Sequence, residues 1–310
     1  MTLAWIGPYR ASRPAPPQPG PSQEDDVALV DRRVALPATE QQYHIGLGPG
    51  EVAEYVVLPG DPERVARIAS RFDSVELQRQ HREFASATGT YRGRRISVIS
   101  TGIGADNVEI VLAEILAITQ HPTFIRVGSC GVLKDDIGLG ELVITSGAVR
   151  LEATTKYFVH EGYPAVADYS AVAALVEAAN TLGHRAHVGI TATAPGFYGA
   201  QGRPIPQLPI RFPDLADEMT RQGVTNFEME ASAVLVLAML AKCRAGVVCA
   251  AYAQRVSGAF VTGQQKERAE AACIETGLEA LRLLADMDEA VTAAGALHWR
   301  PSLWVPSVAS

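Results

Sequence analysis

The chain has 310 residues, of which 47% are hydrophobic, and its formal net charge at pH 7 is −7. This length and apolar content suffice for a full α/β core, built as one large domain or two smaller ones, and we interpret the chain as one domain with loose ends. An acidic chain lacks the broad basic surface on which nucleic-acid binding depends. Its local arginines are therefore expected to bind a small anion.

The cysteines show no paired spacing of the kind that holds a structural zinc ion. Free thiols are typical of a reducing compartment. No apolar run reaches the ~18 residues that a membrane helix needs, and the N-terminus lacks the basic and then apolar layout of a secretory signal. We therefore expect a cytoplasmic protein that crosses no membrane and holds no structural metal.

Composition divides the chain into three parts. Residues 1–40 hold seven prolines and few periodic apolar positions, which predicts a flexible Pro-rich extension. We expect the folded domain at 41–290 and a C-terminal tail at 291–310. The three tryptophans, Trp5, Trp299 and Trp304, all lie in the ends, where they either dock on the domain or a neighbouring subunit or are plain tail residues.

Between these ends, strand-like and helix-like runs alternate. The predicted strands are Tyr55–Leu58, Arg95–Ser100, Thr123–Val127, Leu142–Val149, His187–Thr191 and Gly246–Ala251. The predicted helices are Pro62–Ser70, Asn107–Thr119, Ser170–Leu182, Met229–Lys242 and Gln264–Ala285. This alternation predicts a mostly parallel or mixed sheet covered by helices, with ligands at the carboxyl ends of its strands.

An anion-binding turn is predicted where the strand Tyr55–Leu58 ends and a helix carrying Arg64 begins. Gly60 lets backbone N–H groups approach a ligand, Asp61 can cap the helix, and Pro62 suits its first position. The helix N-terminus carries partial positive charge, to which the arginine adds donors suited to phosphate. Standing alone, the segment would be an ordinary turn with a solvated arginine.

A second glycine-rich turn follows the strand Thr123–Val127. Arg126 lies near the end of this strand, and the turn Gly128–Gly131 adds backbone N–H groups and the hydroxyl of Ser129, which together form a further phosphate cradle. Cys130 is either a nucleophile or a small packing residue. No histidine partner can be assigned to it from the sequence, which favours packing.

A third arginine, Arg82, lies in His81–Phe84, just before a strand that leads to Tyr91, where a solvated surface loop is the default interpretation. The segment Thr101–Asn107 is close to a dinucleotide-binding fingerprint. However, an asparagine replaces its third glycine and no clear ribose-binding acid ends the next strand, which disfavours a nicotinamide or flavin site.

Two carboxylates, Glu228 and Glu230, stand at the start of the very apolar predicted helix Met229–Lys242. They either complement the helix dipole or accept hydrogen bonds from a vicinal diol such as the ribose hydroxyls. The residues alone leave both interpretations open.

Together these segments resemble the bacterial nucleoside phosphorylases, because five motifs occur in the family's order. They are Pro59–Pro62 with Arg64, His81–Phe84, Ser100–Gly104, Arg126–Gly131 and Glu228–Glu230. The resemblance spans roughly Tyr43 to Leu284. It implies a single-domain three-layer α/β/α fold with a central mixed sheet, and a pentosyltransferase that transfers a sugar between a base and phosphate.

The base-binding segments resemble the uridine phosphorylase branch of this family. The resemblance implies that Phe197 stacks on uracil, that Gln201 and Arg203 hydrogen-bond to its amide edge, and that Arg255 lies nearby. A carboxamide matches the alternating acceptors and single N–H of uracil, and arginine is a pure donor. The Ser-Asp pair of the hexameric purine branch is absent from this sequence.

The resemblance also assigns phosphate, ribose and catalytic roles. Phosphate is held by Gly60, Arg64, Arg126 and Ser129, with Arg82 of an adjacent subunit; ribose is held by Met229 and Glu230, with a neighbour's His44. The residues expected to carry catalysis are Arg126, Arg64, Glu230 and Arg203. It further implies a homo-oligomer, commonly a hexamer built as three dimers, whose sites are shared across a dimer interface.

Two departures from the family pattern leave alternatives open. The pair Ser129-Cys130 resembles the purine branch, so a purine nucleoside phosphorylase is the nearest alternative, followed by a nucleoside hydrolase and a non-catalytic nucleoside-binding protein. Glu83 is retained from the monovalent-cation site of some relatives, but Asn107 replaces its serine. We therefore expect phosphate as co-substrate and no cofactor, with potassium in doubt.

Overall fold

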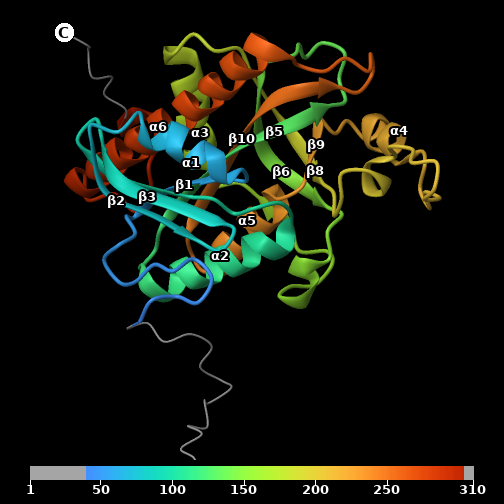
Figure 1. The fold of residues 1–310 in the computed structure, drawn as a ribbon. Helices are drawn as coiled ribbons and strands as arrows, with labels where there is room; N and C mark the ends of the chain where they lie inside the picture. Colours follow the sequence, from blue (N-terminus) through green and yellow to red (C-terminus); the bar gives the residue numbers. More distant parts are fainter. Residues whose placement is uncertain (1–39, 304–310) are drawn as a thin grey trace, which may run out of the picture. The chain divides into compact units, whose positions relative to one another are not determined.

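The computed structural model describes residues 40–303, and the expected extension at 1–40 lies almost entirely outside them (Figure 1). The strands are β1 (Tyr55–Pro59), β2 (Ser74–His81), β3 (Phe84–Tyr91), β4 (Arg94–Ile99), β5 (Thr123–Val132), β6 (Leu142–Arg150), β7 (Ala165–Val166), β8 (Ala186–Thr193), β9 (Asn226–Glu228) and β10 (Arg244–Gln254). The α-helices are α1 (Pro62–Ala69), α2 (Ala105–Ile118), α3 (Tyr169–Thr181), α4 (Leu215–Arg221), α5 (Ala231–Leu240) and α6 (Gly263–Ala293). Short 3-10 turns lie at Thr154–Tyr157, Gly199–Gln201 and Pro301–Leu303.

The strands form one mixed sheet in the order β10-β6-β8-β9-β5-β1-β4-β3-β2, and β10 also pairs with β5. β1 and β5 are parallel neighbours, with Leu58 opposite Arg126 and Pro59 opposite Val127. β1 ends at Pro59, whereas β5 continues to Val132, so this register places the turn that follows β1 beside the Gly128–Gly131 segment of β5.

Helices cover both faces of the sheet, so the expected three-layer α/β/α fold with a central mixed sheet is confirmed. Figure 1 shows α1, α3 and α6 on one side and α2 and α5 on the other. Each side buries its own apolar cluster, the first around Ile125 and Leu281, the second around Phe124 and Leu112. In residues 40–303, no helix is both long and apolar enough to cross a membrane.

The structure differs from the sequence-based expectation at several elements. β2 was not predicted because its side chains are mostly exposed and polar, so no apolar alternation marks it. The expected helix Met229–Lys242 begins only at Ala231, after the short strand β9. Near the C-terminus, α6 extends to Ala293, and Trp299 packs against the apolar cluster of α3 and α6.

Candidate active site

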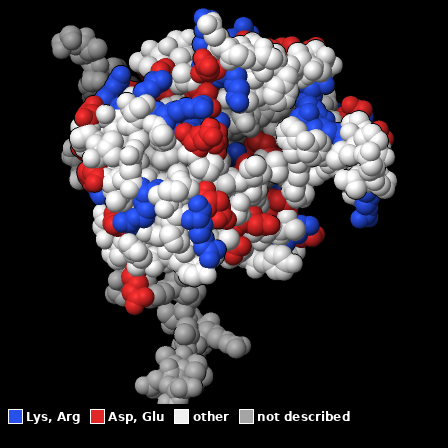
Figure 2. All heavy atoms as spheres, in the orientation of Figure 1, with Lys and Arg blue, Asp and Glu red and all other residues white. Residues whose placement is uncertain are grey.

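A cleft of about 710 Å³ lies at the carboxyl ends of β1, β5 and β9. Among the residues lining it are the following members of the predicted site: Gly60, Arg64, Arg126, Ser129, Phe197, Gln201, Arg203, Met229 and Glu230. Three other predicted residues, His44, Arg82 and Arg255, do not line it. On the face drawn in Figure 2, Lys and Arg are interspersed with Asp and Glu and form no broad basic surface.

The first phosphate turn has the geometry expected from its sequence. Asp61 caps α1 by accepting a hydrogen bond from the backbone N–H of Glu63 at 2.9 Å, and Pro62 is the first helical residue. A Cβ atom on Gly60 would lie 3.2 Å from the backbone oxygen of Gly102, so this turn passes close to the Thr101–Asn107 segment. Arg64 lies in the first turn of α1, is 7% exposed as a whole residue, and lines the cleft.

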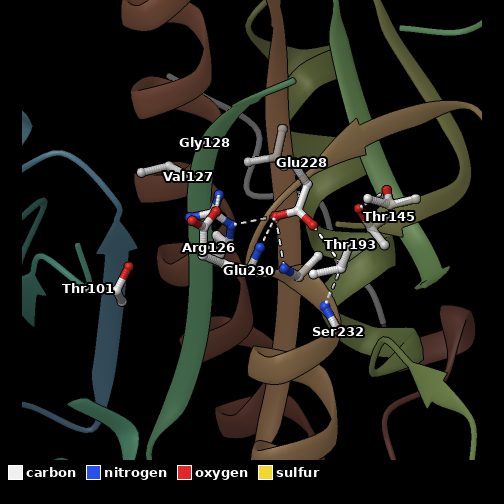
Figure 3. A network of polar contacts seen from close by, with 12 residues as sticks. Thr101, Arg126, Val127, Gly128, Thr145, Thr193, Glu228, Glu230 and Ser232 are labelled. Carbon is white, nitrogen blue, oxygen red and sulfur yellow. Dashed lines mark hydrogen bonds and ion pairs between the residues drawn. The ribbon is translucent and has the colours of Figure 1, made fainter. Parts of the chain in front are cut away.

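Arg126 projects from β5 toward two carboxylates (Figure 3). Its Nε lies 3.2 Å from Oε2 of Glu228 and its Nη2 contacts Oε2 of Glu230, whereas its buried Nη1 has no hydrogen-bond partner among residues 40–303. Burial alone would lower the pKa of Arg126, but the charges of the two carboxylates outweigh it and raise that pKa. A fixed cation with an unsatisfied donor in a cleft wall is suited to an anionic ligand.

The two carboxylates that the sequence left ambiguous have different environments. Glu228 accepts from the hydroxyl of Thr193 at 2.7 Å and from the backbone N–H groups of Glu230 and Ala231 at 2.8 Å, so it orders the start of α5. Glu230 accepts from the backbone N–H of Gly104 at 2.6 Å and lines the cleft. Burial, helped by the nearby Glu228 charge, raises the pKa of Glu230 despite the opposing charge of Arg126.

The second predicted phosphate turn, Gly128–Gly131, is not a turn, because pairing with β10 continues β5 through it to Val132. This glycine-rich strand segment nevertheless requires its first glycine. A Cβ on Gly128 would lie 2.9 Å from Nη2 of Arg126 and 3.0 Å from the sulfur of Cys249, too close for either. Cys130 also lines the cleft, but it is buried, and a hydrogen bond with Cys249 together with burial raises its pKa well above the ordinary value. A thiol that resists ionisation is suited to packing rather than to nucleophilic attack.

The predicted base-binding residues gather at another part of the cleft. The guanidinium carbon of Arg203 lies 4.2 Å from the ring centroid of Phe197, whose side chain is 42% exposed. Burial lowers the pKa of Arg203, and its buried Nε has no hydrogen-bond partner in the described part of the chain. Arg255 does not line the cleft; it lies over the ring of Phe227 and donates from Nη2 to the backbone oxygen of Gln201 at 2.5 Å, in the base-binding loop.

The two residues expected to serve a neighbouring subunit are linked through Tyr43 and His81, and neither lines this subunit's cleft, although Glu83 next to Arg82 does. Arg82 donates to the hydroxyl of Tyr43 at 2.7 Å and lies over its ring, and His81 contacts the backbone oxygen of His44 at 2.8 Å. Nδ1 of His44 lies 2.6 Å from Oε1 of the buried Glu114. We refer to Tyr43, His44, His81 and Arg82 as the His44–Arg82 cluster.

Glu114 and Glu270, each in contact with a predicted site residue, were missed by sequence reasoning. Glu114 lies in α2, 70 residues from His44, and Glu270 lies in α6, 206 residues from Arg64. Each is a buried acid within an otherwise apolar or alanine-rich helical run, and that was the one signal that the sequence offered.

The residues of the doubtful cation site are also visible. Glu83 lines the cleft, whereas the amide nitrogen of Asn107 donates to the backbone oxygen of Ile103 at 3.1 Å. Asn107 thus presents a donor within its own turn, where a serine would present an oxygen.

The fold and this cleft define the class of protein. Residues 54–285 match the model of the Phosphorylase superfamily, and the chain belongs to that family. It is 46% identical over 283 residues to a uridine phosphorylase of Thermococcus kodakarensis, covering 89% of this chain and 99% of the relative. It is 34% identical over 226 residues to a guanosine phosphorylase of Halorubrum lacusprofundi, covering 73% and 87% of the two chains. A crystal structure of a Trypanosoma brucei nucleoside phosphorylase, described as showing uridine phosphorylase activity, matches with a TM-score of 0.73 and 28% identity, covering 78% of this chain and 97% of that one.

Proposed function

We propose that this protein is a uridine phosphorylase that reversibly converts uridine and phosphate to uracil and ribose 1-phosphate. The observation that carries the proposal is the arrangement of one cleft, in which Arg64 lies beside the turn at Gly60 and Arg126 beside the glycine-rich end of β5, Glu230 lies near Arg126, and Phe197 and Arg203 form a third part. An anion site, an acceptor for sugar hydroxyls and an aromatic site with donors are the three components that this reaction needs. The uridine phosphorylases among the relatives support the choice of base.

In the proposed reaction, Gly60, Arg64, Arg126 and Ser129 hold phosphate beside the anomeric carbon. A phosphate oxygen forms a bond to that carbon while the bond from carbon to the N1 nitrogen of uracil breaks, through an oxocarbenium-like transition state. Fixing the anion in place turns a bimolecular encounter into an effectively intramolecular one. The Nη1 of Arg126 supports this role, because it is a buried donor without a partner in the described residues, and a phosphate oxygen would satisfy it.

Ribose and uracil occupy the rest of the cleft in this proposal. Glu230 accepts hydrogen bonds from ribose hydroxyls beside Met229, and Phe197 stacks on the base. Uracil leaves as a delocalised anion, which the donors of Gln201 and Arg203 stabilise. Arg255, through its contact with the Gln201 backbone, holds the loop that presents these donors.

The His44–Arg82 cluster is the basis for proposing an oligomer. We assign Arg82 to the phosphate and His44 to the ribose of a neighbouring subunit, because neither lines the cleft of its own subunit. A closed assembly of such reciprocal dimers completes every site, and we propose a hexamer of three dimers. We place this enzyme in cytoplasmic pyrimidine salvage, with phosphate as co-substrate and no cofactor.

The deciding experiment follows uracil release from uridine with and without added phosphate. Release that depends strictly on phosphate, with ribose 1-phosphate as co-product, is the expected result. Release without phosphate would instead indicate a hydrolase, and tight uridine binding without release would indicate a non-catalytic binding protein. Repeating the assay in sodium and in potassium buffers tests whether the enzyme depends on a monovalent cation. We expect equal rates in the two buffers, because the Asn107 side chain presents a donor where a serine would present an oxygen.

A purine nucleoside phosphorylase is the second candidate function. It is favoured by the Ser129-Cys130 pair and by the guanosine phosphorylase among the relatives. Inosine and guanosine are therefore run beside uridine under the same conditions. Faster phosphorolysis of either purine nucleoside than of uridine would assign the base site to purines.

A further inference from the structure

Arg64 is held by a carboxylate from near the opposite end of the chain. Its Nε donates to Oε2 of Glu270 on α6 at 3.2 Å, and its Nη1 donates to the backbone oxygen of Val127 at 3.2 Å. The side chains of Arg64 and Glu270 are 9% and 6% exposed. These contacts fix the guanidinium at two of its three nitrogens, and Nη2 is the nitrogen without a partner among residues 40–303.

Glu270 is itself fixed by two further donors. Nη1 of Arg67 contacts its Oε1, and the hydroxyl of Tyr252 donates to its Oε2 at 3.4 Å. Burial alone would raise the pKa of Glu270, but the hydrogen bond from Arg67 and the charges of Arg67 and Arg64 outweigh it and hold that pKa below its ordinary value. Glu270 is therefore an anion at neutral pH, and it lines the same cleft as Gly60 and Ser129.

A negative charge in the wall of a phosphate site opposes phosphate binding, because like charges repel. The same carboxylate also orders Arg64, a long side chain whose rotamer freedom would otherwise be lost when the ligand binds. These two effects of Glu270 on phosphate affinity have opposite signs. A substitution at this position therefore shows which effect dominates.

We propose that Glu270 is a positioning residue for the phosphate co-substrate. Glu270 holds Arg64 so that Nη2 of the arginine can contact phosphate. In this way Glu270 strengthens phosphate binding, although the charge of Glu270 itself opposes that binding. The proposal rests on the phosphorylase function proposed above. Glu270 makes no contact with phosphate in this proposal, and its effect on phosphate binding acts through Arg64.

Two substitutions separate position from charge. Glu270→Asp keeps the charge but withdraws the carboxylate from Arg64, and Glu270→Gln keeps the size but removes the charge. We expect both to weaken the binding of inorganic phosphate roughly tenfold, as for loss of a charge-assisted contact, while the KM for uridine stays unchanged. If Glu270 acted through charge alone, the Gln variant would bind phosphate more tightly and the Asp variant would bind it normally, and either result would overturn the proposal.

Phosphate binding is measured by calorimetry without nucleoside, so the result does not depend on turnover. A wild-type protein that binds phosphate but does not cleave uridine would refute the proposed function and leave this test intact, whereas a wild-type protein that binds no phosphate would refute both. In the Arg64→Gln background, Glu270→Gln should cause no further loss, and an equal further loss would mean that Glu270 acts independently of Arg64. Glu275→Gln is the matched control. Glu275 lies on α6 like Glu270 and pairs with Arg71, but it does not line the cleft, so this variant should bind phosphate normally.

Discussion

Arg126 and Glu230 form a buried ion pair in the cleft wall, in which Nη2 of the arginine contacts Oε2 of the carboxylate. Their side chains are 4% and 7% exposed, and Arg126 also contacts Glu228. Removing one member of such a pair leaves an uncompensated charge, which typically costs ~3–5 kcal/mol of stability. The residue proposed to bind phosphate is therefore also one on which the fold around the site depends.

For this reason we expect Arg126→Ala to lose both turnover and stability, and Arg126→Lys to separate the two. Lysine keeps the charge between the carboxylates but loses the second arm of the guanidinium fork. Its kcat/KM should fall by ~100-fold or more, as when a preorganised donor is removed, while most of the stability is retained. Steady-state kinetics and urea unfolding measure the two effects. An Arg126→Lys enzyme with wild-type kcat/KM would contradict the role given to Arg126, and Arg95→Lys, an exposed arginine paired with Glu76, is the control.

The core of this site could be predicted from the sequence because it lies in short contiguous motifs. Gly60 and Arg64 share one strand-to-helix turn, and Arg126 and Ser129 lie three residues apart in β5, so local spacing was enough to group them. The family resemblance then implied that the two segments serve one phosphate, whereas the adjacency of β1 and β5 comes from the structure. The register that places Leu58 opposite Arg126 is visible only in the structure.

The supporting residues could not be predicted because they come from distant helices. Neither the contact of Glu114 with His44 nor that of Glu270 with Arg64 has a local pattern, since each joins segments that tertiary packing alone brings together. Similarly, the sequence could not separate the roles of Glu228 and Glu230. Their difference depends on Thr193, at the end of β8, and on Gly104, just before α2.

The raised pKa of Glu230 predicts that uridine binding weakens at mildly acidic pH. Its ionised carboxylate is the form that accepts hydrogen bonds from ribose, and burial raises its pKa above the ordinary value of 4.5. Uridine affinity should therefore fall as pH is lowered through that raised pKa, at a higher pH than an ordinary carboxyl would require. The effect on folding stability has the opposite pH dependence. Because the folded state favours the protonated form, the contribution of Glu230 to stability is present at low pH and is lost as pH rises through the raised pKa. Calorimetry without phosphate avoids the titration of phosphate itself, and a Glu230→Gln protein that kept the same pH dependence would exclude Glu230 as its source.

Glu114 is predicted to support ribose binding through His44. It accepts from the backbone N–H groups of His44 at 3.0 Å and Ile45 at 2.8 Å and contacts the histidine ring. Glu114→Gln would point amide hydrogens at these donors, so we expect the KM for uridine to rise roughly tenfold with the KM for phosphate unchanged. In a His44→Ala background, the substitution should have no further effect on uridine. Equal rises in both KM values would instead indicate a general disturbance of the fold.

Cys130 is predicted to be dispensable for chemistry. Its thiol lines the cleft but is 6% exposed, and Cys249 and burial keep its pKa high. Cys130→Ala should retain turnover within about threefold and lose ~1 kcal/mol of unfolding free energy, because it removes one buried atom. Thiol-reactive reagents at pH 7 should also label this position slowly. Complete loss of turnover in a folded Cys130→Ala protein would restore the nucleophile interpretation.

The His44–Arg82 cluster predicts that two inactive variants restore each other's activity. Arg203→Ala removes a donor from its own cleft, whereas Arg82→Ala removes one from the neighbour's cleft, so each homo-oligomer should be nearly inactive. In a mixed dimer, the cleft of the Arg82→Ala subunit has its own Arg203 and receives Arg82 from its partner, and is therefore complete. Random mixing after co-expression should give about a quarter of the wild-type activity, since half of the dimers are mixed and one of their two sites is intact. A mixture no more active than its parents would place Arg82 in its own subunit's site, and an active Arg82→Ala homo-oligomer would remove it from the site altogether.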